Sequence, residues 1–519
     1  MHSDGFATQE DRTTIAKILV ICGHPRKDSF CAGLAQAYAL GARRAGADLE
    51  LLYVADLQFD PHVRSASPNQ QKTESDILAA RASILAATHL VFVYPNWWGT
   101  MPALLKGFLD RILAPGFAFH EDERQPGRYV SHLDGRSAEL LVTMDTPPWV
   151  FRYLFHAPGD QAMRHATLGF CGIRTLHARH FGPVKPASPV QREQWLQEAY
   201  KAGEEIFISL EKARRKARRA AWVKLMRLQF YPMTFLAYGI GALAAASTTG
   251  HFDAATFWLG YLFIFVVEVI TVFSNEYFDY PSDKLNQNPG PFNGGSRVLV
   301  KGELSFGAVR TAIVMLALGL LPLGYFLFRG NTALTSADAA AIGAIALLAV
   351  SYTVPPLKLV YRGWGELTVA ATHSALVVAC GYALQSGSWT DPFPWLVSLP
   401  LFFAILPSII LSAIPDYEAD LAAGKRTAVV VLGSRGAVAA AMASTAGAAL
   451  AAVLLHWTGF LPGLGGWLIY LVLPHAGWLM RRLRRFYQEG APCRPIDDLM
   501  LGSLTYVLWF VLVPLLVVW

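Results

Sequence analysis

Charge and paired cysteines are both scarce in this sequence of 519 residues. Only 16% of the residues are charged whereas 53% are hydrophobic, a balance too apolar for an ordinary soluble enzyme of this length. The five cysteines are scattered and form no CxxC pair: Cys22, Cys31, Cys171, Cys380 and Cys493. Their spacing argues against a thiolate zinc site and suits a reducing compartment.

An apolar leader is also missing from the first residues, MHSDGFATQEDRTT. We therefore expect no secretory signal, a flexible tail over residues 1–16, and a soluble segment that remains in the cytoplasm. Charge stays nearly ordinary as far as the basic run KARRKARR at residues 212–219, and apolar runs dominate after it. The chain is therefore predicted to consist of a soluble domain over 17–210 and a membrane domain over 229–519.

The net charge of +6 is small, but it is unevenly placed. The run KARRKARR stands directly before the first long apolar segment. Such a basic run beside a membrane span is typical of the cytoplasmic lipid interface, and nucleic-acid binding is the less expected explanation. We interpret residues 211–228 as a juxtamembrane linker that contacts lipid, and we expect no nucleic-acid partner.

Nine candidate spans are predicted from runs of transmembrane length, at about 229–248, 255–274, 309–329, 337–353, 367–386, 393–415, 437–455, 461–479 and 499–518. With the N-terminal domain inside, nearly all loop Lys and Arg fall on the cytoplasmic side, and the opposite loops offer only Arg329. This bias predicts an all-α bundle of about nine helices in a bacterial-type inner or plasma membrane, with its active site on the cytoplasmic side.

Carboxylates recur at four-residue spacing in two of the predicted cytoplasmic connections. Asn275, Asp279 and Asp283 stand in NEYFDYPSD, and Asp416 and Asp420 stand in DYEAD. Positions four residues apart share one face of a helix, so each motif predicts an acidic stripe. Mg²⁺ typically takes one or two carboxylates together with waters and substrate phosphate oxygens. Two facing stripes, with the four aspartates as ligands, would hold two such ions against a diphosphate.

Basic residues accompany these motifs: Arg297, Lys301, Lys358 and Lys425. They could neutralise the remaining diphosphate charge, arginine through its bidentate fork. A single DxxxD is most often a cap or a solvated pair, but two in equivalent connections are harder to dismiss. Ion transport is the competing functional interpretation. It predicts carboxylates in the middle of the spans, where this sequence has almost none.

The membrane half resembles the UbiA-type intramembrane prenyltransferases over roughly residues 225–519. NEYFDYPSD and DYEADLAAGKRT are similar to the paired aspartate motifs of that family. FNGGSRVLVKG and SYTVPPLKLVYRGWGEL are similar to segments of the branch that contains 1,4-dihydroxy-2-naphthoate prenyltransferase. The resemblance implies Mg²⁺-dependent transfer of a chain from a prenyl diphosphate to an aromatic acceptor. Tyr277, Tyr352 and Tyr361 could face the allylic cation, or could equally be interfacial tyrosines.

The soluble half alternates short apolar runs with polar helical segments. Strands are predicted at 17–22, 49–54, 89–95 and 137–145 and near 175–181, with a closing helix over 189–216. This alternation favours a parallel sheet covered by helices on both faces. Ligands of such α/β domains bind at the carboxyl ends of the strands.

Two loops at those strand ends contain residues that could bind a ligand. HPRKDSF, residues 24–30, places Ser29 at a helix N-terminus, where amides and the dipole favour phosphate. The GxGxxG dinucleotide turn is absent. The loop YPNWWGTMP combines aromatic residues with a small-residue turn, which suits a flat ring. Trp97 and Trp98 could also be core or interface residues, and His24 could be structural.

Together these segments resemble the flavodoxin-like NAD(P)H:quinone oxidoreductases of the DT-diaphorase type, over roughly residues 15–205. The resemblance implies FAD or FMN, NAD(P)H, a quinone acceptor, and room for a homodimer through this domain. It implies flavin contacts from His24, Ser29, Phe30, Pro95, Asn96, Trp97, Trp98 and Gly99. Where that family has a two-glycine loop, this sequence has TMDTPPWV at 143–150, a stiffer and more acidic loop. The flavin type and the nicotinamide site therefore stay open.

We interpret the whole chain as a bifunctional membrane enzyme. A reductase would make or keep a hydroquinone, whose electron-rich ring attacks an allylic cation, and the fused prenyltransferase would use it. Reduction after prenylation is also open, as are the acceptor, either hydroquinone or naphthoate-like, and the prenyl chain length. Two alternatives remain: a transporter or channel with a redox-regulatory flavin domain, and a membrane-anchored quinone reductase with a degenerate prenyltransferase.

Overall fold

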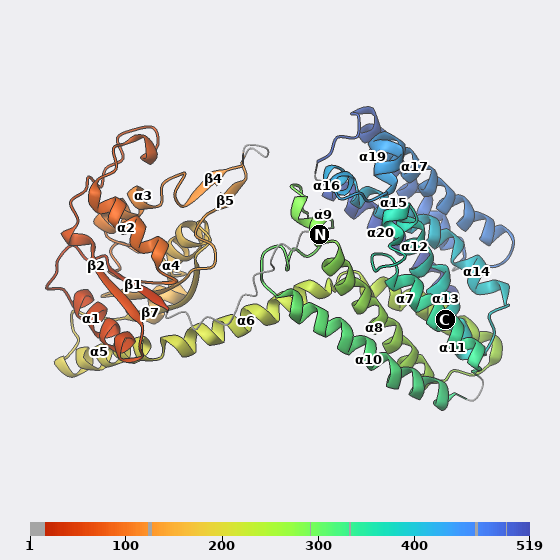
Figure 1. Ribbon diagram of the computed structural model, residues 1–519, viewed down its shortest axis with the longest axis horizontal. Helices are drawn as coiled ribbons and strands as arrows, with labels where there is room; N and C mark the ends of the chain where they lie inside the picture. Colours follow the sequence, from red (N-terminus) through yellow and green to blue (C-terminus); the bar gives the residue numbers. More distant parts are fainter. Residues whose placement is uncertain are drawn as a thin grey trace, which may run out of the picture. The chain divides into compact units, whose positions relative to one another are not determined.

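The computed structural model describes residues 16–122, 127–290, 292–331, 334–461, 466–494 and 496–518. Residues 1–15 of the predicted tail lie outside this part of the chain. The chain divides into two units, Met1–Lys216 and Ala217–Trp519. Figure 1 shows a sheet with helices around it in the first unit and an assembly of helices in the second.

A five-stranded parallel sheet forms the centre of the first unit, with the strand order β2-β1-β3-β6-β7. The strands are β1 (Lys17–Cys22), β2 (Asp48–Tyr53), β3 (His89–Pro95), β6 (Ser137–Thr143) and β7 (Arg174–Phe181). They coincide with the five predicted apolar runs, so the predicted parallel α/β domain is confirmed. A small antiparallel pair, β4 (Phe119–Glu121) and β5 (Tyr129–Ser131), was not predicted, because three residues are too few to show an alternating pattern.

Both faces of the sheet are buried, as the continuous apolar runs require. Successive side chains of a strand point to opposite faces. Ile18 and Val20 of β1 therefore pack with α1 and α5, whereas Leu19 and Ile21 pack with α2 and α3. Figure 1 shows these helices around the sheet. Their bounds are α1 (Phe30–Arg44), α2 (Ser75–Ala86), α3 (Ala103–Ile112) and α5 (Pro189–Glu204).

The strand order changes direction at β1, which has β2 on one side and β3 on the other. In sheets of this kind a crevice opens at the carboxyl ends of the strands at the point of reversal. The loops after β1 and β3 both leave from that edge. The topology therefore brings residues 23–29 and 96–102 to one place, although they are far apart in the sequence.

The second unit is almost entirely helical. One helix, α6 (Ile206–Met226), contains the basic run, and it is followed by α7 (Tyr231–Thr249), α8 (Ala254–Phe278), α9 (Tyr280–Leu285), α10 (Phe306–Gly330), α11 (Ser336–Val350), α12 (Gly365–Thr372), α13 (Ala375–Ser386), α14 (Pro392–Val397), α15 (Leu399–Ser412), α16 (Tyr417–Ala422), α17 (Ala428–Trp457), α19 (Val472–Gln488) and α20 (Asp497–Val518). The predicted all-α membrane domain is confirmed in its class.

The predicted count of nine spans is not confirmed. Among the described residues, six helical segments are long and apolar enough to cross a membrane, or seven if the bent pair α6 and α7 forms one span. The predicted fourth span is α11, which has only 15 residues. The predicted eighth span, at 461–479, includes residues outside the described ones and runs into α19, whose second half is the charged sequence RRLRRFYQ.

Helix α10 shows that the exterior of this unit is apolar. Leu318, Leu321 and Phe326 of α10 are 55%, 70% and 61% exposed. A contiguous apolar face of this length would be unfavourable in water, and it is the expected surface of a helix in contact with lipid. The chain is therefore an integral membrane protein.

Two glycines allow α7 and α13 to approach closely. A Cβ added to Gly241 would lie 1.9 Å from the carbonyl oxygen of Val378, and one added to Gly381 would lie 2.1 Å from that of Tyr238. Small residues of this kind permit backbone contact between membrane helices, where packing replaces the hydrophobic effect as the main source of stability. The contact contributes to the core that surrounds the site described below.

Replacement of Gly241 by alanine should destabilise this helix pair. The added methyl group would meet backbone that cannot move without separating α7 from α13, at a cost of about 1–3 kcal/mol. Gly239→Ala is the control, because a Cβ at Gly239 would lie 3.7 Å from its nearest neighbour, an ordinary contact. The fraction of monodisperse detergent-solubilised protein left after heating should fall at lower temperature for G241A only. Equal behaviour of the two variants would contradict the close-packing argument.

Candidate functional site

The first acidic motif lies where α8 ends and the short helix α9 begins. Asp279 is the C-terminal cap of α8, and Pro281 stands in the first turn of α9. The amide of Asp279 donates to the Asn275 carbonyl over 2.8 Å, and the amide of Asp283 donates to the Asp279 carbonyl over 2.9 Å. Because this i→i−4 bonding continues through the junction, Asn275, Asp279 and Asp283 stay on one stripe.

The second acidic motif lies on α16, with Asp416 at its N-terminal cap. The Ser282 hydroxyl of α9 donates a hydrogen bond of 2.9 Å to Oδ1 of Asp420. This bond connects the two motifs directly. Asp279, Asp283 and Asp420 are all buried.

Lys425 joins the two motifs through its ammonium group. Its Nζ lies 3.1 Å from Oδ2 of Asp279 and 3.2 Å from Oδ1 of Asp420. Lys425 is itself buried. Burial opposes the charge of the ammonium group, but the two carboxylates outweigh burial and raise the pKa of Lys425 above its ordinary value. The structure thus brings together three residues that the sequence analysis assigned separately.

Asp416 is held by the loop that follows α9. Its Oδ1 accepts hydrogen bonds of 2.6 Å from the side-chain amides of Asn286 and Asn293, and its Oδ2 accepts one of 3.1 Å from the amide of Gly294. Burial raises the pKa of Asp416 to about 6, and the hydrogen bond from Asn293 acts in the opposite direction. Asp416 therefore shapes the loop as well as facing the site.

Glu276 holds the other end of this loop. Its carboxylate accepts hydrogen bonds from the amides of Ser296, at 2.8 Å, and Val298, at 3.0 Å. Arg297 has a positive φ of 59°, and its guanidinium donates to the carbonyls of Asp283, at 2.6 Å, and Asn286, at 3.1 Å. In this structure Arg297 therefore fixes the loop against α9.

Steric constraints explain why two glycines stand together in FNGGSR. Gly294 and Gly295 adopt positive φ angles of 69° and 68°. A Cβ on Gly295 would lie 2.4 Å from Oδ2 of Asp283 and 3.0 Å from Oε2 of Glu276. Only glycine lets the backbone pass this close to two buried carboxylates.

Two of the predicted cations lie apart from this cluster. Lys301 is exposed. Lys358 precedes the short 3₁₀ turn Leu359–Arg362 with a positive φ of 44°, and its Nζ lies 5.0 Å from the centre of the Tyr361 ring. Of the predicted tyrosines, Tyr352 faces the cavity described below, whereas Tyr277 packs edge-on against Phe306.

Several site residues were missed by the sequence analysis: Glu276, Ser282, Asn286 and Asn293. They lie outside the Asn275, Asp279 and Asp283 stripe, and three of them act through a loop whose path cannot be read from a periodic pattern. The only available signal was their presence within or beside the quoted motifs.

The site contains several carboxylates but few hydrogen-bond donors for their oxygens. Oδ1 of Asn275 and Oδ1 of Asp279 are buried, and neither has a hydrogen-bond partner among the described residues. Burial raises the pKa of Asp283 to about 8, and the nearby carboxylates of Asp279 and Glu276 act in the same direction. Unpartnered buried oxygens and excess carboxylates are what a hard cation would satisfy.

A ready-made metal cage is not present. No group of three or more His, Cys, Asp or Glu side chains is placed to hold an ion within the part of the chain that the structure describes. Mg²⁺ commonly takes one or two carboxylates and completes its shell with water and phosphate oxygens. The residues present fit such an ion.

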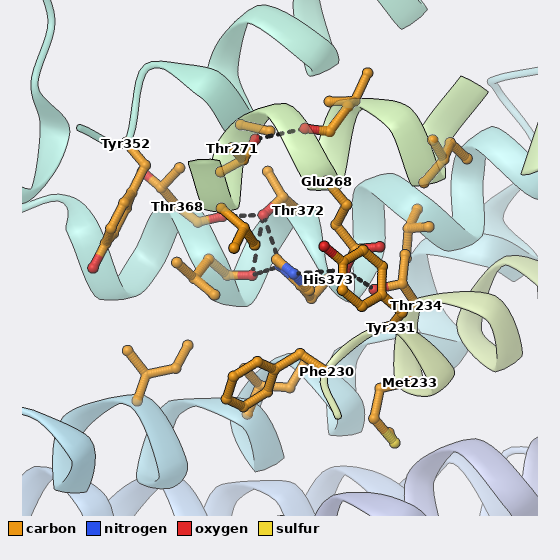
Figure 2. Close-up of a pocket in the computed structure, with 18 of the residues that line it drawn as sticks. Phe230, Tyr231, Met233, Thr234, Glu268, Thr271, Tyr352, Thr368, Thr372 and His373 are labelled. Atoms are coloured by element: carbon orange, nitrogen blue, oxygen red, sulfur yellow. Dashed lines mark hydrogen bonds and ion pairs between the residues drawn. The ribbon is translucent and has the colours of Figure 1, made fainter. Parts of the chain in front are cut away.

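A cavity of about 330 Å³ opens beside these motifs. Asn275 and Tyr352 contribute to its wall, and it extends between α7, α8, α11, α13 and α15 (Figure 2). Its lining is mostly apolar: Phe230, Phe263, Ile264, Val267, Ile342, Ile345, Val377, Ile405 and Ile409 are among the residues that face it. Such a space suits a hydrocarbon chain beside a polar head group.

One carboxylate in this cavity lies in the middle of a span. Glu268 is on α8, and Figure 2 shows it beside His373 and Thr234. The middles of the spans are predicted to contain almost no carboxylates, and Glu268 is not among the predicted site residues. The available signal was its position seven residues before Asn275, which places both on the same face of α8.

In the first unit, Ser29 caps the N-terminus of α1. Its Oγ accepts a hydrogen bond of 3.2 Å from the amide of Ala32. His24 turns the preceding loop, because its Nδ1 accepts from the amide of Arg26 over 2.9 Å. The free amides at the start of this 15-residue helix lie at the carboxyl end of β1, where a phosphate group would be favoured.

A tight turn presents two indole rings near that edge. Trp97 and Thr100 exchange backbone hydrogen bonds of 2.8 Å and 3.1 Å, and Trp98 and Gly99 between them both have positive φ. This is the pattern of a type I′ turn. Trp98 is fully exposed and Trp97 is 45% exposed, with the His24 ring 5.8 Å from the Trp97 ring.

The remaining predicted flavin contacts support this turn or pack nearby. Pro95 is buried at the end of β3, and the amide of Asn96 donates to the Thr143 carbonyl over 2.7 Å. Phe30 packs against Trp195 at a ring distance of 6.0 Å. A helix N-terminus and exposed indoles at one strand edge form a cradle that fits a flavin with its phosphate at α1.

The loop with the sequence TMDTPPWV, residues 143–150, is fixed by a contact of its own. Oδ1 of Asp145 accepts a hydrogen bond of 2.9 Å from the amide of Lys185. Next to this loop, Nε2 of His180 lies 3.1 Å from Asp160, and Nδ1 lies 3.3 Å from Arg152. The loop is therefore tied to the segment after β7.

Comparison with known proteins gives a match for each unit. Residues 234–494 match the UbiA prenyltransferase family, which is half of the chain. The chain belongs to the UbiA prenyltransferase family. Residues 16–206 match the family of the flavodoxin-like fold. Both resemblances found in the sequence are thereby confirmed, and the chain is an enzyme that joins a prenyltransferase domain to a domain of the NAD(P)H quinone oxidoreductase type.

Individual relatives cover one unit each. Ribosyldihydronicotinamide dehydrogenase [quinone] of Pongo abelii is 29% identical over 31% of this chain and 78% of its own length. Lycopene elongase/hydratase of Corynebacterium glutamicum is 28% identical over 42% of this chain and 72% of its own length. The solved NAD(P)H:quinone oxidoreductase of Methanothermobacter marburgensis is 22% identical, covering 37% of this chain and 98% of that one with a TM-score of 0.33.

Replacement of Gly295 by alanine should disable the UbiA site. The new methyl group would be placed against Asp283 and Glu276, and the loop that holds Asp416 would have to move. Gly302→Ala is the matched control: Gly302 also has a positive φ, of 65°, but a Cβ there would meet nothing within 4 Å. Prenyl transfer, measured by product mass spectrometry, should fall at least 100-fold further in G295A than in G302A, because displacement of positioned groups has about this effect. Equal losses would show that backbone strain alone matters.

Proposed function

We propose that the chain reduces a quinone with NAD(P)H in its first unit and prenylates the resulting hydroquinone in its second. The observation that carries the second step is the Lys425 contact, which joins the two aspartate motifs beside an apolar cavity. A diphosphate head group with a long hydrocarbon chain fits this combination of a charged end and an apolar space. The acceptor we propose is a hydroquinone or a naphthoate-like ring.

The charged end would bind the diphosphate. Asp279, Asp283, Asp416 and Asp420 would hold Mg²⁺, and Lys425 lies among them to contact phosphate oxygens. Bound Mg²⁺ would supply charge neutralisation for the pyrophosphate that leaves when the allylic carbon–oxygen bond breaks. The buried asparagines and Gly294 hold Asp416 in place, so the charged groups are oriented before substrate arrives.

The apolar cavity would protect the reactive carbon. An allylic cation reacts rapidly with water, and the cavity is lined mostly by hydrocarbon side chains. Tyr352 faces this space, and its ring could stabilise positive charge through its π electrons. The acceptor ring would then take the place that water would otherwise occupy.

In the first unit, the α1 N-terminus with Ser29 would bind the phosphate of FMN or FAD, and the turn at Trp97, Trp98 and Gly99 would border the flavin ring. Bound flavin would supply hydride transfer from NAD(P)H to a quinone. The loop at Asp145 stands where a two-glycine loop was expected, so the type of flavin and the choice of NADH or NADPH stay open. A homodimer through this unit is part of the proposal.

The two activities suit one another chemically. A quinone ring is electron-poor and does not attack an allylic cation, whereas the hydroquinone ring is electron-rich. Covalent linkage keeps a short-lived hydroquinone close to the enzyme that uses it. We propose that both units work on the cytoplasmic side of a bacterial-type inner or plasma membrane, as the positive loop charges indicate. The domain bounds 17–210 and 229–519, with the linker 211–228, belong to the same proposal.

A second candidate for the acceptor is a polyene hydrocarbon. The observation in its favour is the similarity of residues in the second unit to a lycopene elongase/hydratase. An alkene carbon can attack an allylic cation as an aromatic carbon can. Such an acceptor would need no reductase, so dependence on NAD(P)H separates the two candidates.

Asp279→Asn should abolish Mg²⁺-dependent prenyl transfer. The loss should be about 100-fold or more, as expected for removal of a charged group from a pre-organised site. Asp253→Asn is the control, because Asp253 caps the other end of α8 and asparagine caps a helix equally well. Removal of divalent metal with EDTA should stop the wild-type reaction, and added Mg²⁺ should restore it. Full activity in EDTA would refute the metal assignment, and altered ion flux with intact transfer would favour the transporter.

Prenylation of an oxidised acceptor should require NAD(P)H. The full-length protein in detergent, supplied with geranylgeranyl diphosphate, Mg²⁺ and a naphthoquinone, should form a prenylated product only when NAD(P)H is present. Pre-reduced naphthohydroquinone under anaerobic conditions should remove that requirement. Mass spectrometry of the product gives the readout. Equal product from the quinone with and without NAD(P)H would defeat the coupling of the two units.

A further inference from the structure

Glu268 lies inside the cavity at a distance from the charged end. Seven residues separate it from Asn275 on α8, so it stands roughly 10 Å further along the helix axis, on the same face. Only 11% of its side chain is exposed. A carboxylate in the middle of a membrane span is costly, and it marks a functional position unless its neighbours satisfy it completely.

The neighbours of Glu268 satisfy one of its two oxygens. Its Oε1 accepts a hydrogen bond of 2.6 Å from the Thr234 hydroxyl of α7, and Nε2 of His373 lies 3.4 Å from the same oxygen (Figure 2). The other ring nitrogen of His373 lies 3.1 Å from the carbonyl oxygen of Val369. The same nitrogen lies 3.1 Å from the Thr372 hydroxyl, so His373 is held by contacts at both ring nitrogens.

The second oxygen of Glu268 is left without a donor. Oε2 is buried and has no hydrogen-bond partner among the described residues, and the hydroxyl of Tyr231, which lines the same cavity, has none either. A buried carboxylate oxygen without a donor is unfavourable. The contacts with His373 and Thr234 therefore satisfy only one oxygen of a carboxylate that belongs to the cavity lining.

We propose that Oε2 of Glu268 binds a hydroxyl group of the acceptor and thereby selects a hydroxyl-bearing ring over a quinone. This inference rests on the proposed function. A carboxylate oxygen accepts a hydrogen bond from a hydroquinone O–H, whereas a quinone carbonyl would place a second acceptor against it. Sites that bind a substrate hydroxyl in this way reject analogues without one much more strongly than apolar pockets reject a missing methylene.

The position of Glu268 agrees with this role. The diphosphate would lie beside Asp279, and the reactive carbon of the prenyl chain would enter the cavity next to it. A ring that is anchored by its hydroxyl at Glu268 would therefore lie on the inner side of that carbon. His373 and Thr234 act as positioning residues, because each holds Oε1 and leaves Oε2 available for the acceptor.

Glu268→Gln should reverse the preference between the two redox forms of the acceptor. The full-length protein would receive geranylgeranyl diphosphate and Mg²⁺ without NAD(P)H, so that the reductase cannot interconvert the probes. The KM for 1,4-naphthohydroquinone should rise about 10- to 100-fold, the usual effect of losing a hydrogen bond to a charged group. The inhibition constant of 1,4-naphthoquinone should fall, because the glutamine amide can donate to its carbonyl.

Two further variants make the result specific to Glu268. Glu303→Gln is the matched control: it makes the same change from carboxylate to amide, but Glu303 is not among the residues that line the cavity and pairs with Lys224 at 3.3 Å. It should leave both constants unchanged. Glu268→Asp keeps the charge but retracts it, so it should raise the KM without lowering the inhibition constant of the quinone. This variant also serves if the glutamine variant does not fold.

The outcomes separate this inference from the proposed function. Mg²⁺-dependent binding of geranylgeranyl diphosphate should be equal in the wild type and in E268Q, since Glu268 lies away from the charged end. If that binding and transfer persist while both constants stay unchanged in the Glu268 variants, the acceptor role is wrong and the proposed function stands. If the wild type shows neither binding nor transfer, the proposed function fails and the inference falls with it.

Discussion

The buried contact of Lys425 with Asp279 and Asp420 is the interaction on which the UbiA site depends. The three charged side chains connect α8, α16 and the segment after α16, and all three are buried. A buried ion pair of this kind is costly to build and costly to break. The surrounding loop is shaped to support it, with Asp416 and Glu276 each taking up backbone or side-chain amides.

The polar face of α8 extends this arrangement into the membrane. Glu268, Asn275 and Asp279 lie on one stripe, and beyond them Asp283 continues it on α9. Glu268 and Asp279 have partners and Asn275 lines the cavity, which is how the end of an apolar span tolerates these groups. In the proposed function, one helix would provide both the charged end for a diphosphate and, further along, a hydrogen-bonding group for an acceptor.

The candidate site of the first unit is formed by the topology of its sheet. Strand order alone brings the loops after β1 and β3 to one edge of the sheet, and glycine and a positive φ at Trp98 shape the turn that exposes the indoles. In the proposed coupling, two sites distinguish the redox state of the acceptor. The flavin domain reduces the quinone, and Glu268 binds a hydroxyl group of the resulting hydroquinone.

The sequence by itself determined the strands of the sheet, the class of the membrane domain and the two aspartate motifs, because local periodicity fixes which face a residue occupies. The tertiary structure decided what periodicity cannot encode. Asn286 and Asn293 reach Asp416 through an irregular loop, and Glu268 has meaning only beside His373, which is distant in the chain. The count of nine spans was not confirmed, because α11 has only 15 residues and the second half of α19 is charged.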